Sequence, residues 1–454
     1  MDIGAGISFG NGVSVTKQPP IYLLGLISQS GTNYASPIAI TVDSSGNIYN
    51  LVNDQYSTTL SIMLVKYDSN GTIQWQKTLT NGRQYNGQDK GSVQTDSSGN
   101  VYICTVLRGG DGFDYMITAK YDSSGNLQWQ RQVFNMLGQN IAIDSSGNVY
   151  SMGWGIFTSG QQYSLILVKY DSSGTLQWQK MITTSDNYSD YGNGLGLDSS
   201  GNVYVSGRSS GINIGYDAGF IMKFDSTGST QWQRTLSQSG RSQYPATSIA
   251  INSAGDVYVT GSYAESGLPG RLFLAKYNTS GSIQWQKYLA NNASNPRSNS
   301  GSSVTVDSLG YVYVTGTEVQ NSPEVNNSLI CQYDSNGTLQ WQRRLGKTDS
   351  STYVFGKWIQ ADDNGYIYVS SQTGAVPNTA TIFAKLPTDG TKTGAYTVGG
   401  IGFTYGTSVS GSTAGTATLT DAAGSLAVST SSVSATTSTM TSGTSTLNSS
   451  ITLI

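Results

Sequence analysis

The side chains of this sequence that could do acid–base chemistry are carboxylates, because the chain contains no histidine. Without histidine there is no Ser-His-Asp triad, no imidazole metal ligand and no imidazole base titrating near neutral pH. Two carboxylate pairs, Asp111/Asp114 and Glu318/Glu324, could flank a glycosidic bond if loops brought them about 5–10 Å apart. Nothing around them distinguishes them from ordinary surface carboxylates, so the chain is predicted not to be an enzyme.

Groups that could bind a metal or form a disulfide are few. The recurring Asp-Ser-Ser-Gly-Asn segments resemble the start of a calcium loop. A calcium loop, however, needs several oxygen ligands and a glutamate at its twelfth position, and these segments offer one aspartate and serines. They are interpreted as hairpin turns. Cys104 and Cys331 are predicted to be small buried hydrophobic residues. No metal and no cofactor is expected.

Aromatic and charged residues that could bind a ligand lie where the repeated units of the chain differ most. Aromatic rings with carboxylates and amides suit sugars through stacking and hydrogen bonds to hydroxyls, and they equally suit a protein epitope. The candidate ligand-binding residues are Tyr56, Arg108, Asp111, Asp114, Tyr115, Trp154, Tyr188, Tyr191, Tyr216, Asp217, Tyr263, Glu265 and Arg271. The alternative interpretation is solvated loops with a few packed tyrosines.

These candidates must be positioned by a repeat that runs through most of the chain. A Gln-Trp-Gln core recurs at Trp75, Trp129, Trp178, Trp232, Trp285 and Trp341. An Asp-Ser-Ser-Gly-Asn-Ile/Val-Tyr signature, exact in some units and varied in others, has its glycines at Gly46, Gly99, Gly147, Gly201, Gly255, Gly310 and Gly365. Units of about 53 residues rich in β-branched and aromatic residues predict an all-β fold, a seven-bladed β-propeller with four strands per blade.

The unit around Gly201 illustrates the expected blade. Its four strands are predicted at 194–197, 203–206, 220–224 and 230–236, with a variable loop over 207–218. Because neighbouring strands are antiparallel, the A–B and C–D turns share one face of the disc, here called the plain face. The B–C and D–A loops share the other, the variable face, which carries the candidate residues. Binding residues concentrate on loops held by a rigid scaffold, so the variable face is the predicted binding surface.

The tryptophan of each Gln-Trp-Gln core is expected to pack between blades. Side chains alternate along a strand, so the two glutamines share one side and the tryptophan takes the other. This predicts a packed layer near the rim and argues against exposed sugar platforms. The once-per-blade lysines are expected to reach along apolar surface to the disc edge; they are Lys66, Lys120, Lys169, Lys223 and Lys276.

The ring is predicted to be closed by a strand from the N-terminal part of the chain. Residues 21–28 match the outermost strand of a blade, with Leu23 standing where Trp232 stands. The seventh unit lacks a Gln-Trp-Gln core after Lys385, so residues 21–28 would supply its missing outer strand. Such closure removes a free sheet edge.

The predicted domain organisation has three parts. Residues 1–20 form an N-terminal arm, 21–398 the propeller, and 399–454 a Ser/Thr/Gly/Ala-rich C-terminal segment that is β or extended. A segment this polar buries little by itself. If it is ordered, a neighbouring chain or the propeller wall is expected to order it.

The composition excludes several classes of partner. Charged residues make up 11% of the chain, against about 25% in typical domains, and the net charge is −3 without a basic cluster. This argues against nucleic acid, whose binding needs lysine and arginine to neutralise phosphates. No apolar run approaches the ~20 residues of a membrane span. No basic and apolar leader is visible near Met1, so no signal peptide is expected.

Two resemblances sharpen these expectations. The units Asp-Ser-Ser-Gly-Asn-Val-Tyr and Lys-Tyr-Asp-Ser-Ser-Gly-Asn-Leu-Gln-Trp-Gln resemble the bacterial seven-bladed β-propeller repeat over about 21–398. That family implies a binding scaffold, often extracellular, and fixes no ligand. The segments Met1–Gly10 and Thr420–Leu426 are similar to the ends of marine cyanophage virion structural proteins.

The second resemblance implies a bacteriophage virion protein, acting in tail-associated receptor binding, as a tail fibre does, or in decoration of the particle surface. Its partners would be other virion proteins, reached through the N-terminal arm and the C-terminal segment, and a host-surface glycan or protein. The alternatives are a secreted or cell-surface bacterial carbohydrate-binding propeller and a carboxylate-based glycoside hydrolase.

Overall fold

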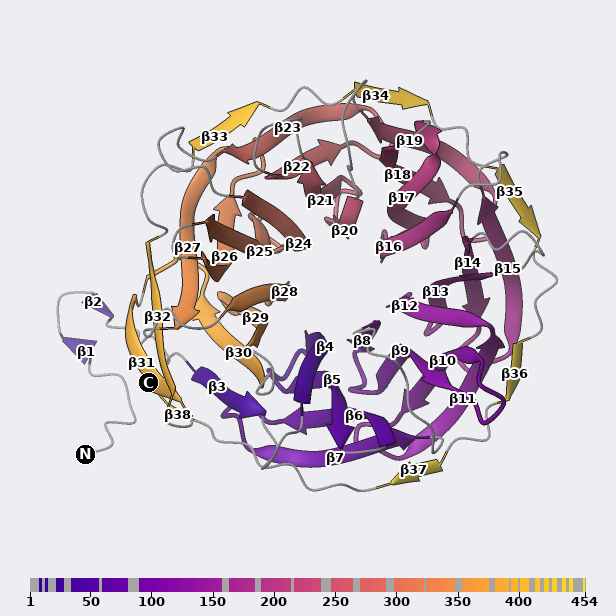
Figure 1. Cartoon of the computed structure of the whole chain (residues 1–454), viewed down its shortest axis with the longest axis horizontal. Helices are drawn as coiled ribbons and strands as arrows, with labels where there is room; N and C mark the ends of the chain where they lie inside the picture. Colours follow the sequence, from indigo (N-terminus) through magenta and orange to yellow (C-terminus); the bar gives the residue numbers. More distant parts are fainter. Residues whose placement is uncertain are drawn as a thin grey trace.

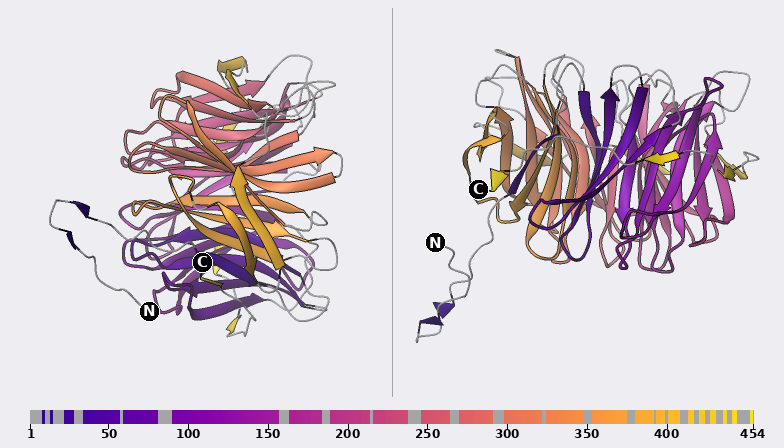
Figure 2. Two further views of the ribbon diagram at one scale, coloured as in Figure 1. Left: turned by 90° about the vertical axis from the view of Figure 1, so that its left-hand side faces the viewer. Right: turned by 90° about the horizontal axis from the view of Figure 1, so that it is seen from below.

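Each repeated unit folds into an antiparallel sheet of four strands, and the sheets stand around a central axis in the computed structural model (Figure 1). The structure describes residues 8–9, 13–14, 22–27, 34–56, 59–80, 90–156, 163–183, 189–213, 216–237, 246–263, 270–290, 298–321, 324–347, 353–374, 380–391, 393–398, 401–407, 413–416, 420–423, 427–430, 435–437, 441–443 and 452–453. Seen edge-on, the blades form a disc (Figure 2). This confirms the predicted all-β, seven-bladed propeller.

Blades 1 to 4 follow the chain in order, innermost strand first. Blade 1 is β4 (Tyr34–Val42), β5 (Ile48–Tyr56), β6 (Thr59–Tyr67) and β7 (Ile73–Thr80), and blade 2 is β8 (Gly91–Thr95), β9 (Val101–Arg108), β10 (Asp114–Tyr121) and β11 (Leu127–Phe134). Blade 3 is β12 (Met136–Ile143), β13 (Val149–Ile156), β14 (Tyr163–Tyr170) and β15 (Leu176–Thr183), and blade 4 is β16 (Asp190–Leu197), β17 (Val203–Asn213), β18 (Tyr216–Phe224) and β19 (Thr230–Ser237).

Blades 5 to 7 complete the ring. Blade 5 is β20 (Ala246–Ile251), β21 (Val257–Tyr263), β22 (Arg271–Tyr277) and β23 (Ile283–Ala290). Blade 6 is β24 (Ser298–Val306), β25 (Val312–Asn321), β26 (Glu324–Tyr333) and β27 (Leu339–Lys347). Blade 7 combines β28 (Val354–Ala361), β29 (Tyr366–Thr373) and β30 (Ala380–Pro387) with β3 (Tyr22–Ile27) from the N-terminal part of the chain.

The ring closes as the sequence predicts. Strand β3 pairs antiparallel with β30, with Leu23 opposite Ala384 and Leu24 opposite Phe383. It therefore takes the outer position that the Gln-Trp-Gln strand holds in the other six blades. Ahead of it, β1 (Ser8–Phe9) and β2 (Val13–Ser14) pair only with each other among the described strands. The described parts of the predicted arm thus lie outside the blades.

The C-terminal strands run around the rim of the disc and add an outer strand to every blade (Figure 1). They are β31 (Gly394–Val398) and β32 (Ile401–Thr407) on blade 6, β33 (Thr413–Thr416) on blade 5, β34 (Thr420–Ala423) on blade 4, β35 (Ala427–Thr430) on blade 3, β36 (Ala435–Thr437) on blade 2, β37 (Thr441–Gly443) on blade 1 and β38 (Thr452–Leu453) on β3 of blade 7. The propeller wall thus orders the described strands of this segment. The predicted boundary at 398/399 falls between β31 and β32, which pair as a hairpin.

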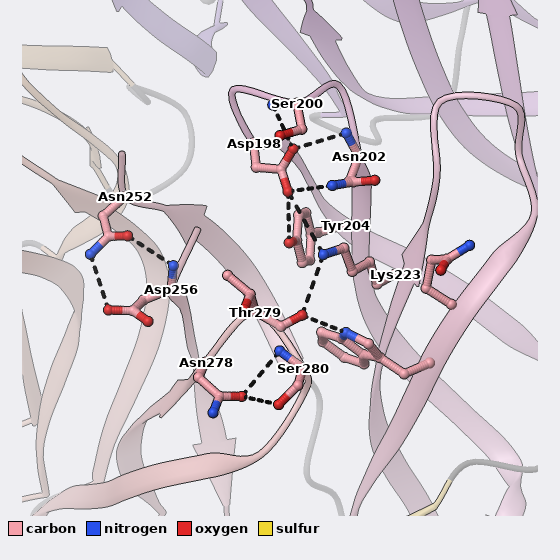
Figure 3. Close-up of polar contacts among 12 residues, drawn as sticks. Asp198, Ser200, Asn202, Tyr204, Lys223, Asn252, Asp256, Asn278, Thr279 and Ser280 are labelled. Carbon is pink, nitrogen blue, oxygen red and sulfur yellow. Dashed lines mark hydrogen bonds and ion pairs between the residues drawn. The ribbon is translucent and has the colours of Figure 1, made fainter. Parts of the chain in front are cut away.

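The plain-face turns are stabilised by their own aspartates. In blade 4, Asp198 Oδ1 accepts hydrogen bonds from the backbone N–H groups of Ser200 and Asn202, at 3.0 and 2.9 Å. Its Oδ2 accepts from the Asn202 side chain and the Tyr204 hydroxyl, at 2.7 and 2.9 Å (Figure 3). Gly201 supplies the left-handed backbone with φ of 76°. These are hairpin turns, as predicted.

Adjacent blades are joined by a contact that repeats around the ring. Trp232 Nε1 of blade 4 donates to the Thr279 carbonyl in the C–D turn of blade 5, at 3.0 Å. Lys223 Nζ donates to the same carbonyl at 3.3 Å (Figure 3). The indole lies against Gly281 of that turn, where an added Cβ would come within 2.7 Å of the ring. The predicted inter-blade packing of tryptophan is therefore confirmed.

The lysine expectation needs correction at Lys223. This side chain is buried between blades, with Nζ 5.1 Å from the Tyr204 ring centroid and 3.8 Å from Asp198. It does not extend to a solvated disc edge, because the next blade presents a carbonyl for its ammonium.

The hydrogen bond that Trp232 donates to the next blade has counterparts in the other blades. The indole N–H donates to a carbonyl of the following blade at Trp75, Trp129, Trp178, Trp285 and Trp341.

Candidate functional site

The plain face has its carboxylates engaged by its own turns. Partial burial alone would raise the pKa of Asp198, but hydrogen bonds from Asn202, Tyr204 and Ser200 outweigh it and hold the pKa below its usual value. The described residues contain no group of three or more carboxylate or thiol side chains that could hold a metal ion. The aspartate oxygens of these turns, which a calcium ion would need as ligands, already accept hydrogen bonds from protein donors.

The structure describes side chains for about half of the candidate binding residues. They are Arg108, Asp111, Asp114, Tyr115, Trp154, Tyr191 and Arg271. Only the backbone is described for Tyr56 at the end of β5, Tyr216 and Asp217 at the start of β18, and Tyr263 at the end of β21. Tyr188 and Glu265 lie outside the described residues.

The predicted loop over 207–218 is wrong for most of its length. Strand β17 continues to Asn213 and β18 begins at Tyr216, with these two residues opposite each other. The hairpin pairing continues beyond the core because antiparallel strands can extend their backbone ladder without burying further apolar side chains. Tyr216 and Asp217 are therefore strand residues.

The B–C hairpin of blade 2 holds four of the candidates in one local network. Tyr115 donates its hydroxyl to Asp111 Oδ2 at 2.5 Å, and the Phe113 N–H donates to Asp111 Oδ1 at 3.1 Å. Arg108 Nε donates to the Gly112 carbonyl at 3.0 Å. Burial raises the pKa of Asp114, and Arg108 acts in the opposite direction. Since Asp111 is engaged within its own hairpin, the Asp111/Asp114 pair does not resemble a free acid and nucleophile.

This hairpin and the end of β11 present two exposed aromatic rings that were not among the candidates. Phe113 is 47% and Phe134 45% exposed, and their ring centroids lie 5.0 Å apart. Tyr115 meets Phe134 edge-on at 5.6 Å. We call Phe113, Tyr115 and Phe134 the blade-2 aromatic patch. Phe113 could have been found from its place two residues before Tyr115.

A second group of side chains comes together from blades 2, 3 and 4. Lys90 directly precedes β8, Trp154 lies in β13, Tyr163 begins β14, Tyr191 lies in β16 and Arg208 in β17. Trp154 meets both tyrosines edge-on, with centroids 4.8 Å apart in each case, and the tyrosines lie 5.4 Å from each other. We call these five residues the cationic aromatic cluster.

The two cations of this cluster lie over its rings. Lys90 Nζ is 3.9 Å from the centroid of a Trp154 ring, and the Arg208 guanidinium is 4.2 Å from that of Tyr191. Such contacts are electrostatically favourable, because the face of an aromatic ring is negative. Burial and the nearby Arg208 charge lower the pKa of Lys90 to about 8. Within the described residues, no carboxylate forms an ion pair with Lys90.

Trp154 contributes a buried donor. Its side chain is 5% exposed, because two tyrosines and Leu137 cover the ring. Its Nε1 is buried without a hydrogen-bond partner in the described structure. An unpaired buried donor costs about 1–3 kcal/mol. Among the described residues, the cluster therefore has an unpaired N–H beside a lysine that forms no ion pair.

Of the predicted residues, the cluster brings together Trp154 and Tyr191, and the sequence analysis missed its other three members. The signal for Arg208 was available, since blades 5 and 6 have Ser262 and Thr317 after the equivalent glycine. Lys90 and Tyr163 had no such signal. Arg271 lies apart in blade 5, with its guanidinium 5.0 Å from the Tyr288 ring.

The remaining reactive groups are buried. Glu318 is 1% exposed, so it cannot contact a substrate as the Glu318/Glu324 pair would require, and the Glu324 side chain lies outside the described residues. Cys104 and Cys331 are free and buried, as predicted, and burial raises the pKa of the Cys104 thiol to about 12. A thiol held neutral in this way is a poor nucleophile.

In the described part of the chain, no helix has the length and apolar character to cross a membrane.

Comparison with known proteins agrees with the fold. Residues 183–215 and 284–317 match the model of the beta-propeller repeat family. These stretches run from the end of β15 through β17 and from β23 into β25, so each covers the link between two blades. An uncharacterized WD repeat-containing protein, L264 of Acanthamoeba polyphaga mimivirus, is 26% identical over 144 residues, which are 27% of this chain and 10% of that protein.

Solved structures with a similar chain path include a polysaccharide lyase, the propeller domain of a protease and an arabinanase. The polysaccharide lyase Uly1 is 11% identical, with a TM-score of 0.48 over 82% of this chain and 99% of that one. The propeller domain of the Trilobed protease from Pyrococcus furiosus, described as having an open velcro topology, is 7% identical, with a TM-score of 0.46 over 78% and 95%. The Penicillium chrysogenum α-L-arabinanase complexed with arabinobiose is 8% identical, with a TM-score of 0.45 over 82% and 99%. None of these similarities assigns an activity.

Proposed function

We propose that the chain is a non-catalytic propeller scaffold that recognises an anionic saccharide on its variable face, with the cationic aromatic cluster at the centre of the site. The observation that supports this most directly is the partly buried Lys90, which lies against Trp154 and has no carboxylate partner among the described residues. A carboxylate or sulfate beside Lys90 would neutralise its ammonium through a charge-assisted hydrogen bond.

The aromatic members of the cluster suit the sugar itself. Tyr163 and Tyr191 are half-buried, so part of each side chain remains exposed. A tyrosine offers large contact area at little cost in conformational entropy and can both stack and donate a hydrogen bond. The blade-2 aromatic patch also carries exposed rings. We propose it as a second contact for a polymeric ligand.

The proposed setting is the virion of a bacteriophage, in which the chain binds an acidic polysaccharide of the host surface or decorates the particle. The resemblance of Met1–Gly10 and Thr420–Leu426 to virion protein ends supports this setting. Contacts with other virion proteins would use residues 1–20 and the outer backbone edges of strands β33 to β37. Each of these strands has one pairing partner among the described strands.

The other two candidate functions fit the geometry differently. A secreted or cell-surface bacterial carbohydrate-binding propeller would use the same face, so it differs in location rather than in the site. A carboxylate-based glycoside hydrolase would need two opposed, accessible carboxylates. Asp111 is bound within its hairpin and Glu318 is buried, so neither predicted pair provides them.

The test of this function is calorimetric titration of the full chain with polygalacturonate oligomers, dextran sulfate and neutral dextran. We expect binding of at least one anionic polymer and none of neutral dextran. Arg208→Gln and Lys90→Gln should each weaken that binding about 10- to 150-fold, because each removes a charge-assisted contact worth about 1.5–3 kcal/mol.

The matched control is Arg271→Gln, which removes a guanidinium stacked on Tyr288 in blade 5. It should bind as the unchanged chain does. Thermal unfolding of all three variants checks that the blades are intact. Equal binding of neutral dextran, or unchanged affinity in both cluster variants, would contradict the proposal.

A further inference from the structure

The rim strands follow one register from blade to blade. The residue two positions after the core tryptophan is paired with Thr416 in blade 5, Ala423 in blade 4, Thr430 in blade 3 and Thr437 in blade 2. Each of these is seven residues after the one before. In blade 1 the register continues, because Gly443 lies opposite Thr78 as Thr436 lies opposite Gln132.

The sequence of this segment has the same period. An apolar residue occupies every seventh position of a stretch that is otherwise rich in Ser, Thr, Ala and Gly. These residues are Leu419, Leu426, Val433, Met440, Leu447 and Ile454. These six residues lie outside the described residues. Strand β33 precedes Leu419, and strands β34 to β37 fall between successive members of this series, one strand for each seven-residue unit.

From this register we infer that the C-terminal segment forms a belt in which strands β33 to β37 carry a seven-residue repeat matched to the spacing of blades 5 to 1, with one repeat for each of these blades. The step from blade 6 is longer, because Arg343, two positions after Trp341, pairs with Thr407, nine residues before Thr416. Seven extended residues span about 23–25 Å, and in each described repeat three or four of them pair with the outer strand. This inference does not depend on the proposed function.

The belt replaces the long outer edge of each blade with the edge of a short strand, which is less prone to pair with other chains. The outer strand of each blade would otherwise present unpaired N–H and C=O groups that invite pairing with other chains. Small serine, threonine, alanine and glycine side chains let a short strand lie against that edge without requiring an apolar core. Asp421 is the one charged residue from 399 onward, so the belt attaches through its backbone rather than through ion pairs.

The belt also closes the ring a second time. Its last described strand, β38, pairs with β3, placing Leu453 opposite Tyr22 and Thr452 opposite Leu23. Strand β3 is thus held between β30 and β38. Strand β3 from the N-terminal part of the chain and β38 from its C-terminal part therefore meet in blade 7.

The test uses engineered disulfides to read the register. Cα atoms of opposed residues in antiparallel strands lie about 4.5–5.5 Å apart, within the range of a disulfide. In the full chain, Gln132→Cys should form an intramolecular disulfide with Thr436→Cys and none with Gly443→Cys. Deleting 431–437 removes one repeat, so Gly443 should move opposite Gln132, and the Gln132→Cys/Gly443→Cys pair should then form.

The matched control deletes only 431–433, which breaks the period. Here neither pair should form at the rate seen in the full chain, because the chain becomes too short to reach the next blade in register. Non-reducing electrophoresis and peptide mass spectrometry identify the pairs. The inference is overturned if the Gly443→Cys pair forms in the full chain, if it fails to form after deletion of 431–437, or if the disulfides join different molecules.

Discussion

Removal of residues 1–30 is expected to open the ring and to cost on the order of 5 kcal/mol, a large part of the 5–15 kcal/mol that stabilises a typical protein. The deletion takes away β3, which is the outer strand of blade 7 and lies between β30 and β38. It exposes both backbone edges that β3 now covers and uncovers the blade 7 core around Ile382 and Ala384. Such edges pair readily with other chains.

Denaturant unfolding and light scattering measure both consequences. The shortened chain should unfold at lower denaturant concentration and should form oligomers at concentrations where the full chain does not. Deletion of residues 1–20 is the matched control, because β1 and β2 pair only with each other among the described strands. A chain lacking 1–30 that unfolds like the control would show that β3 does not close the ring.

Substitution of Trp232 by alanine is expected to destabilise the protein by about 3–5 kcal/mol, as for a large aromatic residue in a core. The change removes the hydrogen bond to Thr279 and the contact with Gly281, so it loosens the junction of blades 4 and 5. It also uncovers part of the hydrophobic cluster formed by Tyr204, Ile249 and Tyr277. The free energy of unfolding gives the magnitude directly.

Gln231→Ala provides the comparison on the same strand. Its exposed side chain donates only within its own blade, to Asp225 and the Ser229 carbonyl. This variant should stay within about 0.5 kcal/mol of the unchanged chain. Saccharide binding should be the same for both variants, because neither residue lies on the variable face. A loss below about 1 kcal/mol for Trp232→Ala would mean that the ring of tryptophans is not part of the inter-blade packing.

The blade architecture was predictable because one pattern recurs in most units. The aspartate turn with its tyrosine and the tryptophan of the Gln-Trp-Gln strand make the same hydrogen bonds in several blades. A local pattern that is weak evidence in one unit becomes strong evidence for the fold when several units share it. Closure by 21–28 followed from the same comparison, since one unit lacked a strand that another segment could supply. The extent of β17 and β18 was not predictable, because their outer ends have no apolar alternation.

The binding site was only half predictable. Arg108 to Tyr115 form one hairpin and could be grouped from sequence, whereas Lys90, Trp154 and Arg208 are brought together by the curvature of the ring across three blades. The partial burial of Lys90 depends on neighbours more than 60 residues away, and a single sequence does not reveal such neighbours.

The seven-residue period of the belt was missed for a different reason. A run of Ser, Thr, Ala and Gly is typical of low-complexity segments, and one apolar residue in seven is too sparse for the packed face of a helix or of an alternating strand. The period corresponds to the equal spacing of the blade edges, as the pairing of Thr416, Ala423, Thr430 and Thr437 shows.

The most direct test of anion recognition by the cluster is the pH dependence of polygalacturonate affinity in the full chain. Burial and Arg208 lower the pKa of Lys90 to about 8, so its ammonium is charged below that pH and neutral above it. Affinity should therefore be constant from pH 6 to 7 and fall as the pH rises through about 8 to 10. Lys90→Arg, whose guanidinium stays charged, should keep its affinity over this range. An affinity that does not change up to pH 10, or the same decline in Lys90→Arg, would contradict the account.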